Sequence, residues 1–177
     1  MAFDRTRTAR GALAGGVAAA VWAAQQPLDK RLFGVDYDDA ELLGRFVARG
    51  GAGYAAGVAL HVTNGALFGA AYANVARALP GPRWARGPLA GLAEHLATWP
   101  ATMLCARLPA WSGLPALWGS WPAFAQATWR HLLFGAVLGE LERRLNPDEV
   151  EAEPMDDAIA ATNGHGHAEH MATSGPV

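Results

Sequence analysis

Two long stretches of this chain contain no charged side chain, and they constrain its fold more than any other feature. Residues 11–28 form a run of eighteen without Asp, Glu, Lys or Arg, and residues 50–76 form a run of twenty-seven. A helix needs about 20 mainly apolar residues to cross a bilayer. A surface helix of a soluble protein instead shows charges along one face at a spacing of about 3.6 residues. The two stretches therefore predict helices surrounded by lipid.

Two further stretches, residues 87–106 and 121–141, are apolar apart from a few polar side chains. With them, the sequence predicts an all-α fold, a bundle of four transmembrane helices that makes residues 1–147 a helical membrane domain. Ala and Gly add little insertion energy, and the mean hydropathy of the chain is only +0.08, so a soluble bundle is the alternative. The polar residues in the two stretches are Glu94, His95, Gln126, Arg130, His131 and Glu140.

The charged residues lie between the apolar stretches and in the last part of the chain. Residues 146–177 carry seven acidic residues and no Lys or Arg, which leaves residues 1–145 with a formal charge of +5. Arginines and aromatic residues do not form the continuous stripe that is typical of a nucleic-acid-binding surface. We therefore expect a lipid bilayer as the partner, and no nucleic acid. No motif predicts a cofactor.

The distribution of Lys and Arg predicts how the helices enter the membrane. With both termini on the cytoplasmic side, the inner segments hold eight of these residues and the outer segments hold five. Because positively charged loops favour the cytoplasm, we expect a multi-pass protein of the plasma (inner) membrane, N-in and C-in. Residues 1–25 also have the pattern of a cleaved secretory signal, with three arginines before an apolar run, and this alternative stays open.

Short motifs recur between the two halves of the chain. The sequence RGALAG at residues 10–15 returns as RGPLAG at 86–91, and LFGA at residues 67–70 returns at 133–136. A repeat at this spacing predicts two tandem helical hairpins, with chance matching in a Gly- and Ala-rich chain as the alternative.

Five Gly-x-x-x-Gly spacings fall inside the predicted helices. In lipid, apolar burial does not drive helices together, so close approach of backbones at small residues supplies the contact. We expect these glycines to face neighbouring helices of the same chain, with homo-oligomer formation as the alternative. The pairs are Gly11/Gly15, Gly53/Gly57, Gly65/Gly69, Gly87/Gly91 and Gly135/Gly139.

The segment between the first two predicted helices has a helix signal of its own. Asp38 and Glu41 have the spacing of an N-terminal cap, and Leu42, Leu43 and Phe46 follow at helical spacing. We expect a short amphipathic helix that lies on the membrane surface, or one that covers the end of the bundle.

The last thirty residues differ in composition from the rest of the chain. Residues 148–177 are rich in acidic residues, Ala and Gly and poor in large apolar side chains, which predicts a disordered, acidic, His-containing tail. Its histidines, His165, His167 and His170, favour at most weak metal binding, with a flexible tail as the alternative.

Ionisable side chains inside the predicted helices are the candidates for a functional site, because unpaired charges at membrane depth are costly. At a rise of 1.5 Å per residue, Glu94 and Arg130 come within reach of each other on neighbouring helices, which predicts an ion pair. We expect the pair to belong to one polar network. The further members are His95, His131, His61, Asn64 and Glu140.

This network has two interpretations. In the first, histidines and carboxylates carry protons or hold a small solute, and the protein serves proton or solute handling or envelope homeostasis. In the second, the polar groups only fix helix register, and the protein is a non-catalytic structural or partner-binding module. The residues show no His-x-x-x-His or Glu-x-x-His spacing for a metal, and no nucleophile beside a base. No catalytic residue is predicted, and enzyme activity is left open.

Taken together, several of these motifs resemble the YagU-like family of small, uncharacterised, multi-pass inner-membrane proteins. The likeness covers about residues 8–146. It implies a helical membrane protein and points to no substrate. The residues that carry it are 11–27, His61-Val-Thr-Asn64, Arg86-Gly-Pro-Leu-Ala-Gly91 with His95, and Arg130-His131 followed by Glu140.

Overall fold

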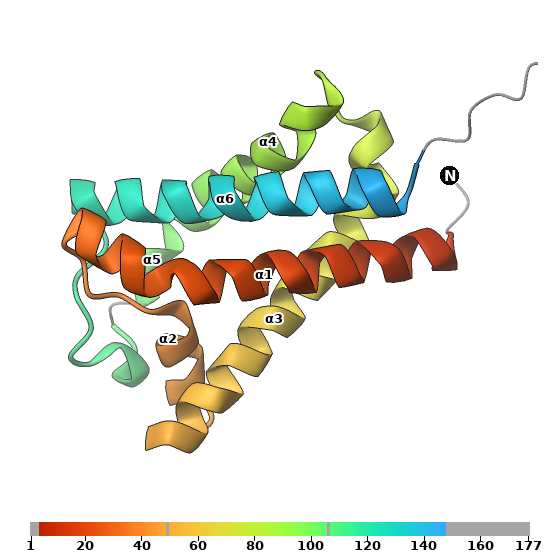
Figure 1. The fold of residues 1–177 in the computed structure, drawn as a ribbon. Helices are drawn as coiled ribbons and strands as arrows, with labels where there is room; N and C mark the ends of the chain where they lie inside the picture. Colours follow the sequence, from red (N-terminus) through yellow and green to blue (C-terminus); the bar gives the residue numbers. More distant parts are fainter. Residues whose placement is uncertain (1–3, 49, 106, 148–177) are drawn as a thin grey trace, which may run out of the picture. The chain divides into compact units, whose positions relative to one another are not determined.

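The computed structural model describes residues 4–48, 50–105 and 107–147, and every regular element in them is helical. The predicted all-α class is confirmed for this part of the chain. Figure 1 shows the order of the helices. The α-helices are α1 (Arg5–Phe33), α2 (Asp39–Arg45), α3 (Gly50–Val75), α4 (Arg83–Thr98), α5 (Ala101–Cys105) and α6 (Trp121–Leu145), with short 3₁₀ helices η1 (Ala76–Ala78) and η2 (Pro109–Trp111).

Among the described residues, none of the helices combines the length and the hydropathy that crossing a membrane requires. The prediction of four transmembrane helices is therefore not supported. The predicted stretches do form helices, but Ala and Gly supply much of their length, and both residues contribute little hydropathy.

The third predicted helix is also shorter than expected. Helix α4 ends at Thr98, and Pro100 separates it from the five-residue helix α5. Trp99 keeps helical backbone and donates to the carbonyl of His95, but Pro100 has no N–H to continue the helix, and the next bonds, from Thr102 to Trp99 and from Met103 to Pro100, span only three residues. The single helix predicted over residues 87–106 is wrong for this reason.

Helix α1 is longer than predicted at both ends. The carboxylate of Asp4 accepts hydrogen bonds from the backbone N–H groups of Thr6 and Arg7 and caps the first turn. The helix then continues through Pro27 and ends at Gly34, whose φ of 67° lies in the left-handed region that glycine adopts without strain. As a result, Asp29 belongs to the helix and its side chain is completely buried.

Helices α1 and α3 cross at glycines from both partners. A Cβ atom added at Gly11 or Gly15 would lie within 3.0 Å of backbone or side-chain atoms of α3, and one added at Gly65 or Gly69 would meet α1 equally closely. Such separations are shorter than real Cβ contacts, so only glycine allows the two backbones to approach this far.

Helices α4 and α6 cross in the same way. A Cβ atom at Gly87 or Gly91 would lie within 3.0 Å of the α6 backbone, and one at Gly135 would lie within 3.0 Å of the α4 backbone. Glycines of each half of the predicted repeat therefore make equivalent crossings. The expectation that the five Gly-x-x-x-Gly pairs face neighbouring helices of the chain is confirmed.

The predicted short helix after α1 forms as α2. The Asp38 carboxylate accepts from the N–H of Glu41, which is the expected cap. Helix α2 packs on α3, where Gly57 lies against the backbone of Ala40 and Gly44. The side chain of Phe46 stays exposed. Helix α2 thus covers part of α3, and its position on a membrane surface or over the end of the bundle stays a prediction.

The long helices of the described domain form two pairs, and one helix of each pair contacts the other pair. Helix α1 packs on α3, α4 packs on α6, and α1 lies beside α6 (Figure 1). The outer helices α3 and α4 scarcely touch each other. The first turn of α1 lies beside the last turn of α6, where Arg7 forms an ion pair of 2.6 Å with Glu142.

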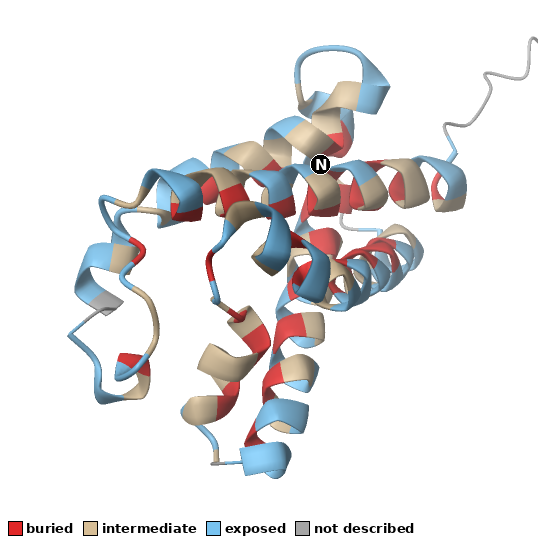
Figure 2. Ribbon diagram, turned by 60° about the vertical axis from the view of Figure 1, so that its left-hand side comes forward, coloured by how far each residue is buried: buried red, intermediate tan, exposed pale blue. Residues whose placement is uncertain are grey.

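Buried and exposed residues are distributed unusually in this domain (Figure 2). The core between α1, α3 and α6 consists mainly of small residues with a few aromatic rings, among them Ala14, Ala18, Trp22, Tyr72 and Phe134. Large apolar side chains instead lie exposed on the outer faces of the long helices. They include Leu13, Val17, Val21, Leu28 and Leu32 on α1, Leu60 and Leu67 on α3, Leu89 and Leu96 on α4, and Trp129 and Leu132 on α6.

The predicted tail, residues 148–177 with His165, His167 and His170, lies outside the described residues. Its disorder stays a prediction. The described part of the chain reaches Pro147.

The crossing of α1 and α3 yields a prediction with an internal control. Replacing Gly15 with Ala forces a methyl group against the α3 backbone, so we expect a loss of about 1–3 kcal/mol in the free energy of unfolding. The neighbouring Gly16 has room for a methyl group, with ordinary contacts at 3.7 Å to Val62. Gly16→Ala should leave stability unchanged or raise it by up to about 1 kcal/mol. Chemical unfolding of both variants measures the difference, and equal effects would contradict the crossing.

Candidate binding pocket

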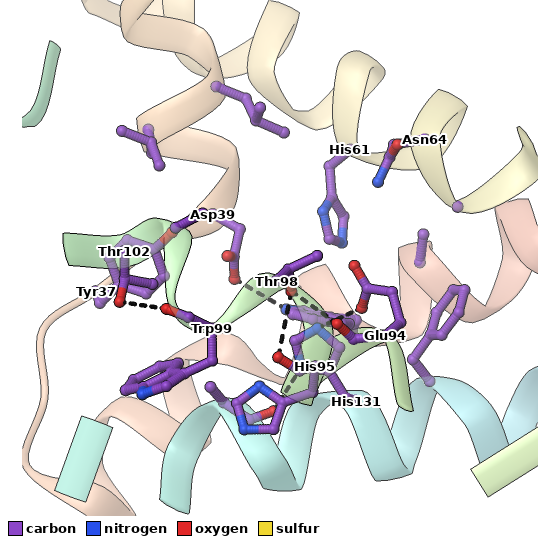
Figure 3. Close-up of a pocket in the computed structure, with 18 of the residues that line it drawn as sticks. Tyr37, Asp39, His61, Asn64, Glu94, His95, Thr98, Trp99, Thr102 and His131 are labelled. Atoms are coloured by element: carbon purple, nitrogen blue, oxygen red, sulfur yellow. Dashed lines mark hydrogen bonds and ion pairs between the residues drawn. The ribbon is translucent and has the colours of Figure 1, made fainter. Parts of the chain in front are cut away.

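A pocket of about 330 Å³ opens between the two outer helices, above the floor that α1 and α6 form. Its walls are mainly aromatic and aliphatic, with a small number of polar groups among them, which is typical of ligand sites. The aromatic residues that line it are Trp22, Tyr37, Phe68, Trp99, Trp111 and Phe134, and the polar ones are Asp39, His61, Asn64, Glu94, His95, Thr98, Thr102 and His131 (Figure 3).

His61 on α3 points into this pocket (Figure 3) and is 8% exposed. Its ring forms a backbone hydrogen bond with Ala19, whereas Nε2 has no hydrogen-bond partner among the described residues. In the neutral tautomer with the proton on Nδ1, Nε2 presents a lone pair. Burial lowers the pKa of His61, which keeps the ring neutral near pH 7. The pocket therefore contains a buried ring nitrogen that can accept a hydrogen bond and has no partner among the described residues.

Glu94 on α4 and His131 on α6 form an ion pair of 2.7 Å between a carboxylate oxygen and Nε2. The other ring nitrogen, Nδ1, lies 2.7 Å from the carbonyl oxygen of Ala127, which only accepts. Both nitrogens of His131 therefore face oxygen atoms. His131 can donate to both oxygen atoms when each of its ring nitrogens carries a proton.

His95 lies beneath this pair and is almost completely buried. Its ring centroid is 4.8 Å from that of His131, and its Nε2 is 3.1 Å from the hydroxyl of Thr128. That hydroxyl donates to the carbonyl of Phe124, so His95 donates to the hydroxyl oxygen. Burial, together with the charge of His131, lowers the pKa of His95 to about 4. His95 is therefore neutral above pH 5.

Arg130 does not pair with Glu94, and the predicted ion pair is wrong. Its guanidinium instead binds both carboxylate oxygens of Asp29 at 2.6 and 2.7 Å, and Asp39 at 2.8 Å. It also donates to the carbonyl of Tyr37. Burial alone would lower the pKa of Arg130, but the hydrogen bond to Asp29 and the charges of Asp39 and Asp29 raise it. The partner of Arg130 depends on how each helix is rotated about its axis. The prediction used only the height of each residue along the helix axis, which does not determine that rotation.

Glutamines complete the hydrogen bonds of this buried cluster. Gln126 on α6 donates to Asp29 at 2.8 Å and to the carbonyl of Val35, and Gln25 donates to Asp29 at 2.6 Å. Asp29 and Asp39 were not among the predicted network residues, because both lay outside the expected spans. The spacing of Gln25 and Asp29, four residues apart, places both on one helix face once α1 is known to continue through Pro27, and it is a signal for Asp29 but not for Asp39.

The structure separates the remaining predicted residues. Asn64 is exposed at the wall of the pocket, on the same helix as His61. Glu140 lies two turns beyond the pocket on α6 and pairs with Arg143 and Arg144, whose hydrogen bonds lower the pKa of its carboxyl to about 2. The inclusion of Glu140 in one network with the others is therefore wrong.

Within the described ranges, no group of three His, Cys, Asp or Glu side chains is placed to hold a metal ion. Comparisons of the chain with family models, curated proteins and solved structures give no match.

The lowered pKa of His95 predicts how stability depends on pH. The unfolded chain binds a proton at His95 below about pH 6.5, whereas the folded protein binds it only near pH 4. The contribution of His95 is therefore fully present above pH 6.5 and is lost as the pH falls towards 4. We expect a slope of up to about 1.4 kcal/mol per pH unit from this residue.

Urea unfolding between pH 7 and pH 5 measures this slope. His95→Gln keeps a donor for Thr128 but does not titrate, so its stability should fall less steeply over the same range. An unchanged slope in His95→Gln would show that His95 is not the titrating group.

Proposed function

We propose that this protein is a lipid-associated helical protein that binds a small, mainly apolar solute in the pocket between α3 and α4. The unpartnered Nε2 of His61 carries the proposal. A buried polar atom without a hydrogen bond costs about 1–3 kcal/mol, and a ligand that donates a hydrogen bond there would recover it. The aromatic walls supply the apolar contact area for such a ligand.

A volume of about 330 Å³ is at the lower end of the range for small-molecule sites. The pocket draws its walls from both helix pairs, with His61 from one pair and Glu94, His95 and His131 from the other. A ligand seated there would contact both pairs at once. Binding would therefore stabilise the arrangement in which α3 and α4 stand apart.

The outer faces of the helices support lipid as a partner. Large apolar side chains lie exposed on α1, α3, α4 and α6, whereas most buried residues are small or polar, with a few aromatic and aliphatic side chains among them. Exposed apolar surface on several helices is typical of membrane or protein contacts. The proposal includes a lipid bilayer as the partner of these faces, the inner membrane as the location, and membership of the YagU-like family. A second copy of the chain is the alternative partner for the apolar faces.

Proton handling is the second candidate function, and the arrangement of the histidines favours it. A carboxylate oxygen of Glu94 lies 2.7 Å from Nε2 of His131, and the neutral ring of His95 lies next to this pair. A carboxylate and two imidazoles in contact are the kind of groups that relay protons. If these polar groups only fix the register of the helices, the protein is a structural module without a ligand.

A neutral fluorinated alcohol, para-fluorophenylethanol, tests the binding proposal because it combines an aromatic body with one hydroxyl donor. We expect its fluorine NMR signal to shift and broaden in a saturable way on adding the protein. His61→Leu removes the acceptor and should weaken binding about tenfold, which is the loss of one buried hydrogen bond.

Ala101→Trp provides a second variant, because Ala101 is exposed at the wall of the pocket and a tryptophan there would fill it. Ala55→Trp, at an exposed position of α3 outside the pocket, is the matched control. If para-fluorophenylethanol binds both tryptophan variants equally, it does not bind in this pocket and the proposal is wrong. Flotation of the protein with phosphatidylglycerol-containing vesicles tests the lipid part, and recovery with the unbound fraction would contradict it.

A further inference from the structure

The charges around the pocket indicate what kind of solute it holds. Two carboxylates line it, Asp39 and Glu94, and no Lys or Arg is found among the described residues of its wall. The remaining titratable groups of the wall are Tyr37 and three histidines. The only positive group that the described wall offers is the ring of His131, and Glu94 already pairs with it, so an anionic solute would meet carboxylates without a free cationic partner.

The nearest arginine does not neutralise both of its partners. Arg130 carries one positive charge and binds Asp29 and Asp39, which carry two negative charges between them. The cluster keeps a net charge of −1. Asp29 is completely buried, whereas the Asp39 side chain is 23% exposed and borders the pocket. The net negative charge of this cluster therefore makes the electrostatic potential inside the pocket more negative.

The second carboxylate is also available to a ligand. Glu94 uses one oxygen, Oε2, for His131, and its side chain is 34% exposed. In Figure 3 the Glu94 side chain and the His61 ring point into the same space from opposite walls. A donor group between them would meet a carboxylate on one side and the imidazole lone pair on the other.

Four hydrogen-bond donors of the pocket wall are already occupied. The hydroxyl of Thr98 donates to the carbonyl of Glu94, and that of Thr102 donates to the carbonyl of Trp99. The indole N–H groups of Trp22 and Trp111 donate to Asp39 and to the carbonyl of Pro115. With these donors engaged, the second carboxylate oxygen of Glu94 and Nε2 of His61 are acceptors that favour a ligand with donor groups.

Aromatic rings add a further attraction for positive charge. The wall contains the indoles of Trp22 and Trp99, whose π faces attract cations more strongly than those of Phe or Tyr. Carboxylates and aromatic faces around one space are the usual environment of a bound ammonium group.

We propose that the solute of this pocket is an organic cation, an amine with an apolar body whose ammonium group lies between Glu94 and His61. The inference rests on the proposed binding function and gives it a substrate class. The ammonium group donates to the His61 lone pair and to the Glu94 carboxylate, and the apolar body packs on the aromatic wall.

Three probes of nearly equal size test the sign of the charge: para-fluorophenylethylammonium, the neutral para-fluorophenylethanol and the anionic para-fluorophenylpropionate. Fluorine NMR titrations of the intact protein give the dissociation constant of each. We expect the ammonium to bind at least about tenfold more tightly than the carboxylate, with the alcohol between them. Equal or tighter binding of the carboxylate would overturn the inference.

Two glutamate variants locate the charge that matters. Glu94→Gln should weaken binding of the ammonium several-fold and change binding of the alcohol little, because only the cation gains from the carboxylate. Glu140→Gln, which removes a carboxylate outside the pocket, should change neither. If the preference for the ammonium survives in Glu94→Gln, this assignment is wrong.

The outcomes separate the inference from the function beneath it. If the alcohol binds and the ammonium binds no more tightly, the inference that the solute is a cation is wrong, but the proposed binding function is retained. Failure of all three probes to bind a folded protein would refute the binding function itself.

Discussion

A buried arginine determines how the two helix pairs meet. Arg130 on α6 is 1% exposed and binds Asp29 on α1 and Asp39 on α2, so one guanidinium joins three helices. A charge this deeply buried is tolerated only when its donors are satisfied, and Nε, Nη1 and Nη2 of Arg130 each donate to an acceptor. The position and rotation of α1 relative to α6 follow from this requirement.

The glycine crossings and the arginine together explain why a pocket exists. Close crossings bind α3 to α1 and α4 to α6, and the arginine cluster binds α1 to α6. Nothing comparable joins α3 to α4. In the repeat that aligns residues 67–70 with 133–136, the position equivalent to Arg130 is Asn64, which lies exposed at the pocket wall. The interface of α1 with α6 is filled by the ion cluster. The equivalent space between α3 and α4 contains the pocket.

Local signals in the sequence predicted much of this fold. The uncharged stretches became the long helices, Asp38 caps α2, and the glycine pairs face their neighbours, because each signal acts within a few residues or repeats along one helix face. Membrane crossing was not supported, since absence of charge does not measure the low hydropathy of Ala and Gly.

The site was harder to predict than the fold. His61, Asn64, Glu94, His95 and His131 do line one pocket. Their pairing was missed because the partner of a buried charge depends on helix rotation, and because the extension of α1 through Pro27 brought Asp29 into the core. Neither property can be read from spacing along the chain.

A double-mutant cycle on Asp29 and Arg130 tests most directly whether this cluster organises the domain. Arg130→Met leaves the Asp29 carboxylate buried without its cation, and we expect a loss of about 3–5 kcal/mol in the free energy of unfolding. Adding Asp29→Leu should restore part of that loss, because the unpaired charge is then gone. A loss below about 1 kcal/mol in Arg130→Met, with no coupling to Asp29, would be the behaviour of a solvent-exposed pair and would contradict the account.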